Sequence, residues 1–333
     1  MSRAVDTSAT HVPGRSRQPL LARGGLGLPL ILFAFFALLP LLALASGQGF
    51  LVTIATRILI LAIAAVSLDL ILGYGALVSF GHAAFIGIGA YVVGIMAYHG
   101  VSDILAQLAV LVLVAGLFAL LTGAVSLKTR GVYFIMITLA FAQMAYFSTT
   151  SLAMYGGDDG LTLRQRSTLF GYSPFEDRTV LYYVALAVLI GAFALCRAVV
   201  GSRFGRVLQG CRQSPSRMQA LGFSPYRYQL VAYVLAGLIA AVAGALLVNQ
   251  IAFVSPSYMA WQRSGELIFM VVLGGMGTLY GAIIGAFAYV ATEEVLSHFT
   301  HHWRVIFGPL LILAVLFVRG GLISLIFPRR DDG

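Results

Sequence analysis

The chain has 333 residues, of which 60% are hydrophobic and only 10% are charged, and its net charge at pH 7 is +9. An ordinary soluble domain carries about 25% charged residues, so this composition excludes a water-soluble fold and predicts an all-α integral membrane protein with about 8–10 transmembrane helices. The excess of arginine does not indicate nucleic-acid binding, because the basic residues stand in loops and at the ends of apolar runs, as they do in cytoplasmic membrane flanks.

Residues 1–27 are polar and basic, and we interpret them as a cytoplasmic N-terminal tail. The apolar run that follows, at about 28–46, is nearly long enough to span a membrane. A cleaved signal peptide has the same order of basic, apolar and small residues, and this alternative stays open. We favour a retained first span, a transmembrane domain over 28–320 and a C-terminal tail at 321–333.

Apolar segments follow one another along the rest of the chain, and a span needs roughly 20 apolar residues. The segment at 264–296 is too long for one plain crossing and contains several closely spaced glycines, so we expect it to be broken. A re-entrant half-helix followed by a crossing is the favoured interpretation, and two short segments are the alternative. The expected segments lie at about 28–46, 50–72, 82–98, 104–126, 132–152, 179–198, 229–250, 264–296 and 303–319.

The positions of the basic residues set the expected orientation. Counting crossings from a cytoplasmic N-terminus places Lys128 and Arg130 inside, the mixed loop at 154–178 outside, and the basic loop at 199–228 inside. Beyond residue 250 the number of crossings stays open, and the arginines near the C-terminus favour a cytoplasmic C-terminal end.

Two glycine-interrupted apolar segments, at 73–91 and 274–289, stand in comparable places in the two halves of the chain, which indicates an internal pseudo-repeat. Paired interruptions point to a translocation site at a repeat interface. Tight helix packing explains the same glycines, because Gly277, Gly281 and Gly285 are spaced by four and are expected on one helix face. The residues assigned to a translocation path or to helix packing are Asp69, Gly73, Gly81, His82, Gly87, Gly274, Gly275, Gly277 and Gly281.

Arg57 and Asp69 are the charges that lie most clearly inside an apolar run. They are 12 residues apart, about 18 Å along a helix, so we expect them not to pair with each other. Intramembrane charges face a protein interior, a cavity or the end of a span, and direct handling of solute or protons is the alternative for both. We expect His82 to be a hydrogen-bonded structural histidine, with a role in the path as the alternative.

No catalytic, cofactor-binding or metal-binding set stands out in the sequence. The only lysine, Lys128, lacks the glycine-rich lead of a P-loop, so the chain is not expected to hold ATP itself. His298, His301 and His302 cluster near the end of a span beside two glutamates. We interpret this cluster as an interfacial loop rather than a metal site.

The connection at 199–228 carries five arginines. It predicts a short helix followed by a second one at 215–221, with Ser214 as the N-cap, Pro215 in the first turn and Gly222 as the stop. A loop of this shape suits docking in the groove of a soluble partner, and a solvated positive loop without a partner is the alternative.

The loop expected outside the membrane contains a run of glycine and aspartate. Gly156, Gly157, Asp158 and Gly160 predict a tight acidic turn, because these residue types favour turn conformations. An external docking protein is one partner that such a turn would meet.

Five blocks, spread in order from about residue 60 to residue 320, together resemble the signatures of one family. That family is the membrane permease subunits of branched-chain amino acid ABC importers, and the likeness is to the larger of its two permeases. The blocks include Ser79-Phe80-Gly81-His82-Ala83-Ala84-Phe85, Arg130-Gly131-Val132-Tyr133-Phe134, Gly156-Gly157 with Gly160-Leu161, Ser202-Arg203-Phe204-Gly205-Arg206 and Val272-Leu273-Gly274-Gly275-Met276-Gly277.

The resemblance implies a machine of several parts in the bacterial inner membrane. An extracytoplasmic solute-binding protein delivers the solute, this chain and a second homologous permease form the path through the lipid bilayer, and two soluble ATPases drive alternating access. The chain itself would be a transport subunit and not an enzyme, with no cofactor. The residues that match the family's cytoplasmic coupling loop are Gly205, Arg206, Arg212, Ala220 and Gly222, of which the two arginines are implied to contact the ATPase.

The sequence departs from the family pattern at two places. Gln213-Ser214-Pro215-Ser216 replaces the acidic residues that family members usually carry after Arg212. Asp69 stands where asparagine is commoner in the family, and this aspartate resembles the urea-type members. Leucine, isoleucine and valine are the implied solutes, and urea or a short amide is the alternative. A secondary transporter without a motor is the alternative of a different class, but it would have no ATPase for the basic loop to dock. A membrane-embedded enzyme is disfavoured because no cluster of acids, histidines and a nucleophile faces one site.

Overall fold

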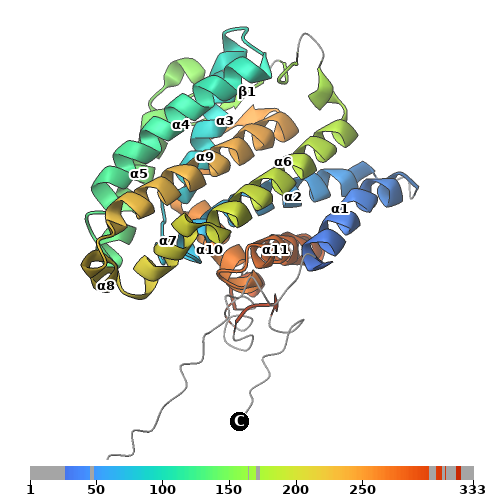
Figure 1. Ribbon diagram of the computed structural model, residues 1–333. Coiled ribbons are helices and arrows are strands. Elements are labelled where there is room, and N and C mark those ends of the chain that lie inside the picture. The colour runs from blue at the N-terminus through green and yellow to red at the C-terminus, as the bar shows by residue number, and fades with distance from the viewer. Residues whose placement is uncertain are drawn as a thin grey trace, which may run out of the picture.

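The computed structural model describes residues 27–45, 49–163, 165–169, 173–299, 305–309, 312 and 320–323. Residues 1–26 of the predicted N-terminal tail, most of the predicted span at 303–319 and most of the C-terminal tail lie outside this part of the chain, as do His301 and His302. The described residues are helical almost throughout, which confirms the all-α class (Figure 1).

Each of the seven apolar segments predicted between 28 and 250 is a helix in the structure. An apolar helix is stable in a bilayer because it satisfies its backbone hydrogen bonds internally where no water is present. The basic loop adds two shorter helices. The bounds are α1 Gly27–Ala45, α2 Gly49–Leu72, α3 His82–Tyr98, α4 Ile104–Ser126, α5 Val132–Thr150, α6 Arg178–Gly201, α7 Arg203–Gln213, α8 Pro215–Ala220 and α9 Pro225–Ile251.

The long segment predicted at 264–296 is broken, as expected. It forms α10 (Trp261–Gly274) and α11 (Tyr280–Phe299), which are joined by a loop at 275–279. α10 has 14 residues, or about 21 Å of helix, which is shorter than the hydrocarbon core of about 30 Å. α10 on its own is therefore too short for a full crossing.

The loop between α10 and α11 owes its shape to left-handed backbone conformations. The φ angles are 119° at Gly275, 77° at Gly277 and 40° at Leu279, and such residues cannot continue a right-handed helix. The prediction that Gly277 shares a helix face with Gly281 and Gly285 is therefore wrong, because Gly277 lies in the loop that precedes α11.

α2 and α9 lie in the middle of the bundle, whereas α4 and α5 lie at one edge (Figure 1). α2 packs against α6, α9, α10 and α11, and α9 also packs against α3 and α4. In the most apolar 18-residue stretch of each helix, 72% of the residues of α2 are buried, but only 22% of those of α4 and of α5. Their exposed side chains are mostly apolar, such as Leu113 and Leu121, so this edge is suited to face lipid.

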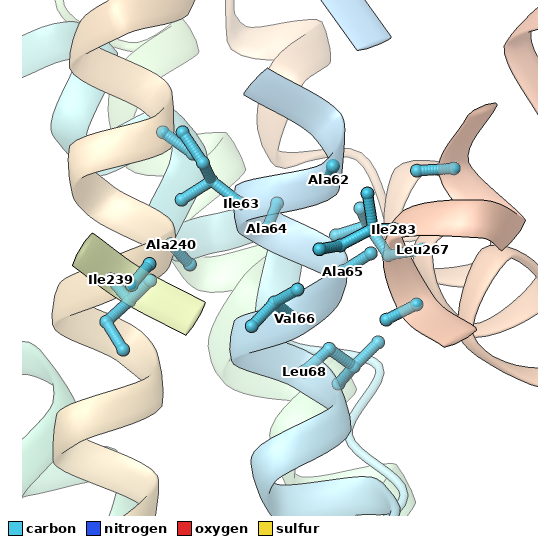
Figure 2. Close-up of a cluster of buried hydrophobic side chains, with 14 of the residues drawn as sticks. Ala62, Ile63, Ala64, Ala65, Val66, Leu68, Ile239, Ala240, Leu267 and Ile283 are labelled. Carbon is cyan, nitrogen blue, oxygen red and sulfur yellow. The ribbon is translucent and has the colours of Figure 1, made fainter. Parts of the chain in front are cut away.

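The core around α2 consists of small and branched side chains (Figure 2). Ala64 and Ala65 of α2 are fully buried, with Ile239 of α9 on one side of the helix and Leu267 and Ile283 of α10 and α11 on the other. Lipid tails are as apolar as these side chains, so helix association rests on close van der Waals packing. Small residues on the central helix allow that close approach.

Glycines permit direct backbone contact where α10 and α11 cross. A Cβ atom added at Gly285 would overlap the carbonyl oxygen of Met270, and one at Gly281 would lie 2.9 Å from the carbonyl oxygen of Gly274. Gly281 and Gly285 therefore do serve the close packing that the sequence predicts, although Gly277 does not share their face.

The sequence did not predict two short strands. β1 (Leu161–Thr162) pairs antiparallel with β2 (Phe253–Val254), which follows the end of α9. A 3-10 helix, η4 (Pro256–Met259), leads from β2 to α10. This small ribbon fixes the loop after α5 to the end of α9.

Candidate functional site

The basic connection, called below the α7–α8 segment (residues 199–228), folds as predicted. Ser214 caps α8, since its hydroxyl accepts a hydrogen bond from the N–H of Arg217 at 3.4 Å. Pro215 stands at the start of α8. Gly222 follows the helix with a φ angle of 86°, which ends it in the usual way. The prediction of two short helices with this cap and this stop is confirmed.

α7 buries one face and exposes the other. Val207, Leu208 and Cys211 are buried against the bundle, and burial raises the pKa of the Cys211 thiol, which keeps it protonated and unreactive. A Cβ atom at Gly205 would overlap the backbone of Val200 at the end of α6, so the α6–α7 joint requires glycine. The exposed residues of the segment include Arg203, Arg206, Arg212, Arg217, Gln219, Ala220, Leu221, Phe223 and Arg227.

This exposed surface mixes cations with large apolar side chains. Leu221 is 65% exposed and Phe223 39% exposed, and they follow directly after α8. Arginine and aromatic residues are enriched at protein–protein interfaces. The surface is therefore chemically suited to a protein partner that offers acidic and apolar groups.

Arg212 differs from the other arginines of the segment because its guanidinium turns back toward the bundle. Its Nη1 donates a hydrogen bond to the carbonyl oxygen of Gly73, directly after α2. One turn earlier on α2, Asp69 is fully buried, and its carboxylate accepts hydrogen bonds from the N–H groups of Gly277 at 2.7 Å and Leu279 at 2.9 Å. Four of these five residues are buried, and Arg212 reaches them from the exposed face of the segment; we call the five the buried clasp.

The buried clasp joins elements that are far apart in the sequence. Gly73 and Gly277 belong to the two glycine-interrupted segments, and a Cβ atom at Gly73 would overlap the backbone of Gly277. A buried charge is tolerated only when polar groups satisfy it, and the two N–H donors of the loop do so for Asp69. Through these bonds α7 is linked to the end of α2, and α2 to the α10–α11 loop.

His82, at the start of α3, is also fully buried. Its Nε2 is 2.8 Å from the hydroxyl of Ser67 on α2. The hydroxyl of Ser264 on α10 accepts a hydrogen bond of 3.0 Å from the N–H of Ala83. These bonds tie the start of α3 to two neighbouring helices.

All nine residues assigned from the sequence to a translocation path or to packing are buried. Gly81 packs against the backbone of Thr138, and Gly87 packs against the side chain of Met259. In this conformation the structure gives them packing contacts, and their role in a path stays a prediction.

The other end of α2 carries a different group of charges. Nη2 of Arg57 lies 3.0 Å from each carboxylate oxygen of Glu293 on α11, so Arg57 pairs with Glu293 rather than with Asp69. Arg263 and Glu266 form a second pair at 2.8 Å near the start of α10. A cavity of about 260 Å³ lies beside them, lined by residues of α2, α3, α9, η4 and α10.

The predicted tight turn is present in the loop after α5. Gly156, Gly157 and Gly160 have φ angles of 87°, 51° and 83°, and the N–H of Asp159 donates to the carbonyl oxygen of Gly156 at 3.0 Å. Asp158 is exposed at its tip. β1 follows directly, so the ribbon with β2 holds the turn at one end of the bundle.

The described residues contain no group of three or more His, Cys, Asp or Glu side chains placed to hold a metal ion. Nε2 of His298 lies 3.7 Å from a carboxylate oxygen of Glu294 on the same helix. The side chain of His298 is largely exposed, and that of Glu294 is partly exposed. The candidate features in the described residues are the α7–α8 segment, the buried clasp and the cavity beside Arg263 and Glu266.

Comparison with known proteins places these features in context. The family described as branched-chain amino acid transport system / permease component matches residues 50–316. This match includes α2 to α11 and therefore the α7–α8 segment, the clasp and the cavity. No solved structure matches the chain.

Two groups of relatives are informative. The chain is 26% identical over 320 residues to the high-affinity branched-chain amino acid transport system permease protein LivM of Escherichia coli (strain K12), covering 88% of this chain and 75% of that protein. LivM of Salmonella typhimurium gives the same identity and coverage. The chain is also 30% identical over 225 residues to the autoinducer 2 import system permease protein LsrC of Yersinia pestis (strain Pestoides F), covering 62% of this chain and 61% of that protein.

Proposed function

Because this chain belongs to the family of permease components of branched-chain amino acid transport systems, and so to the ABC importer permeases of the bacterial inner membrane, we propose that it carries leucine, isoleucine and valine. It is a transport subunit, not an enzyme. In this proposal it forms half of a translocation path together with a second homologous permease, and a binding protein outside the membrane delivers the solute.

The observation that carries the proposal is the connection between the exposed α7–α8 segment and the membrane core. In the proposed orientation this segment faces the cytoplasm, where its basic surface docks on a separate ATPase. Arg212 hydrogen-bonds Gly73 at the end of α2, and Asp69 holds the α10–α11 loop. Movement of a docked ATPase therefore reaches α2 and α11 through defined bonds.

The mechanism that follows is alternating access by rigid-body movement. Packed helices shift as units because a close-packed interior does not deform continuously. ATP binding and hydrolysis on the partner subunits supply the energy, and the chain converts that movement into opening on one side and closing on the other. The glycine contacts between α10 and α11 keep these helices moving together.

The nature of the solute rests on two supports. LivM, which is similar to this chain over most of its length, is named for branched-chain amino acid transport. Branched-chain amino acids carry no net charge, and the two ion pairs at the cavity near α10, Arg57–Glu293 and Arg263–Glu266, also sum to zero. LsrC, which is similar to a shorter part of this chain, is named for import of autoinducer 2.

Uptake of labelled solutes in cells with and without the gene tests the proposal. We expect ATP-dependent uptake of labelled leucine to fall when the gene is deleted and to return when it is restored. Labelled urea is the comparison solute, because urea or a short amide is the alternative within the same machinery. Loss of urea uptake with unchanged leucine uptake would contradict the proposed solute and leave the importer mechanism in place.

A further inference from the structure

The cavity between α2, α9 and α10 combines apolar and charged residues in its wall. Its volume is about 260 Å³, and its walls combine the apolar side chains of Leu61, Leu247 and Leu267 with charged groups of Arg263 and Glu266. Arg57 also lines it. One part of the wall is thus aliphatic and another part is charged.

The charges cannot face lipid. Ionised side chains within a membrane protein face the protein interior or a water-filled cavity, because hydrocarbon does not solvate them. Arg57 lies inside the apolar helix α2, and its side chain is still 33% exposed, while that of Arg263 is 43% exposed. The face on which the cavity opens is therefore covered by water or by another subunit, in contrast to the apolar edge formed by α4 and α5.

The signs of the charges are balanced. Arg57 pairs with Glu293, and Arg263 pairs with Glu266, so the group carries two positive and two negative charges. A neutral group of this kind gives no net attraction to an anion or a cation. It offers separate positive and negative partners to a solute that carries both charges at once.

We propose that this cavity binds the α-amino acid during transport. Arg263, with Arg57 beside it, receives the carboxylate, Glu266 receives the ammonium group, and the aliphatic side chain lies against Leu61, Leu247 and Leu267. Arginine presents a planar fork of donors that matches a carboxylate. Glutamate supplies the acceptors that an ammonium group requires.

This inference rests on the proposed function and names the chemical class of its solute. An uncharged amide such as urea has no formal charges to replace those of an ion pair, so it gains less from this wall than a zwitterion does. A free carboxylic acid or a free amine satisfies only one of the two partners and leaves the other without its counter-charge.

The ion pair at the start of α10 is suited to exchange. Arg263 and Glu266 are three residues apart on one helix and partly exposed, and such pairs are weakly held. A zwitterion that enters between Arg263 and Glu266 replaces their ion pair by two new ones, one between its carboxylate and Arg263 and one between its ammonium group and Glu266. Because a transport site must also release its solute, a weak resting pair is an advantage.

The test uses the complete complex of both permeases and both ATPases in lipid nanodiscs, without the binding protein, so that the binding protein's own selectivity does not enter. Binding of labelled leucine is measured directly, in competition with 4-methylpentanoate, which lacks the ammonium group, and with 3-methylbutylamine, which lacks the carboxylate. We expect each analogue to compete at least about ten-fold more weakly than leucine, as the loss of one charged partner implies.

Two neutral variants then assign the partners. E266Q is expected to weaken leucine binding by about ten-fold or more and to remove the preference over 4-methylpentanoate. R263Q is expected to remove the preference over 3-methylbutylamine. These shifts in preference are not produced by a loss of structure alone. Q262A, at a neighbouring exposed position that does not line the cavity, is the matched control and is expected to bind leucine normally.

Two results would overturn the inference: no saturable leucine binding by the wild-type complex at millimolar concentrations, or unchanged binding and preference in the R263Q/E266Q double variant. ATP-driven leucine uptake by the wild-type importer with its binding protein tests the proposed function separately. Normal leucine uptake together with either of these two binding results contradicts only the assignment of the solute site to this cavity. If the wild-type importer takes up no leucine, the proposed function is contradicted, and leucine as the solute with it.

Discussion

The two ends of α2 hold charges in different ways. At one end Asp69 is fully buried and is satisfied by backbone N–H groups of a single loop. At the other end Arg57 and Glu293 are partly exposed and pair side chain to side chain beside a cavity. Backbone donors fixed by a loop cannot leave their acceptor without moving the loop, whereas exposed side chains exchange partners easily.

This difference assigns different tasks to the two ends of one helix. In the proposed mechanism the Asp69 end transmits movement, because it is buried and linked to α7 through Gly73 and Arg212. In the same proposal the Arg57 end accommodates a solute, because its side-chain partners are replaceable. About 18 Å of helix separates the two charges, and the packed core around Ala64 and Ala65 connects them (Figure 2).

The largest expected effect is at the docking surface. Arg206→Glu reverses a charge on the exposed face of α7 and is expected to abolish ATP-driven leucine uptake while the protein still inserts in the membrane. Uptake in membrane vesicles and the amount of inserted protein measure the two properties. Lys128→Glu, an equal reversal at an exposed residue outside the α7–α8 segment, is the matched control. Normal transport by Arg206→Glu would remove the docking role of this face.

The next effect is at the clasp. Asp69→Ala leaves the N–H groups of Gly277 and Leu279 buried without an acceptor, which is expected to destabilise the protein by about 3 kcal/mol. The measurement is thermal unfolding in detergent. Asp69→Asn keeps one acceptor oxygen, so we expect it to reduce the free energy of unfolding by about half as much as Asp69→Ala does. An unchanged unfolding temperature for Asp69→Ala would show that the clasp is not a rigid joint.

Close packing between α10 and α11 gives a somewhat smaller effect. Gly281→Leu forces a side chain against the hydroxyl of Thr278 and the carbonyl oxygen of Gly274, and overpacking of this kind costs about 2 kcal/mol. We expect lower yield of folded protein and lower transport. Gly191→Leu on α6, where nothing lies within 4 Å of the added Cβ atom, serves as the control. Equal yield and uptake for the two variants would contradict the packing argument.

The smallest effect on stability is expected at the open end of α2. Glu293→Gln weakens a partly exposed ion pair, and such pairs contribute about 1 kcal/mol or less. Its unfolding temperature should therefore stay close to that of the wild type and well above that of Asp69→Ala. A loss as large as that of Asp69→Ala would mean that both ends of α2 are equally rigid, and the comparison would fail.

Local signals in the sequence predicted much of the fold. The apolar segments gave seven helices, the glycines marked the break between α10 and α11, and Ser214, Pro215 and Gly222 defined α8. These features depend on neighbouring residues, because caps, turns and span lengths are set within a few positions of the chain.

Partners distant in the sequence were not predictable. Glu293 lies 236 residues from Arg57, and the loop donors of Asp69 are 208 and 210 residues away. The spacing of Gly277 from Gly281 predicts a helical position for it, and only its left-handed backbone shows otherwise. The sequence also does not predict the inward turn of the Arg212 guanidinium, since a basic loop gives no signal of which arginine faces the bundle.

Reconstitution in liposomes tests most directly whether force reaches this chain from outside it. The second permease is co-reconstituted, the binding protein is added outside the liposomes, and both ATPases and ATP are enclosed in the lumen. ATP should then drive accumulation of leucine in the lumen. Without the ATPases the same permeases should accumulate nothing, whatever proton or sodium gradient is imposed. Uphill leucine transport on an ion gradient alone would contradict the proposed mechanism.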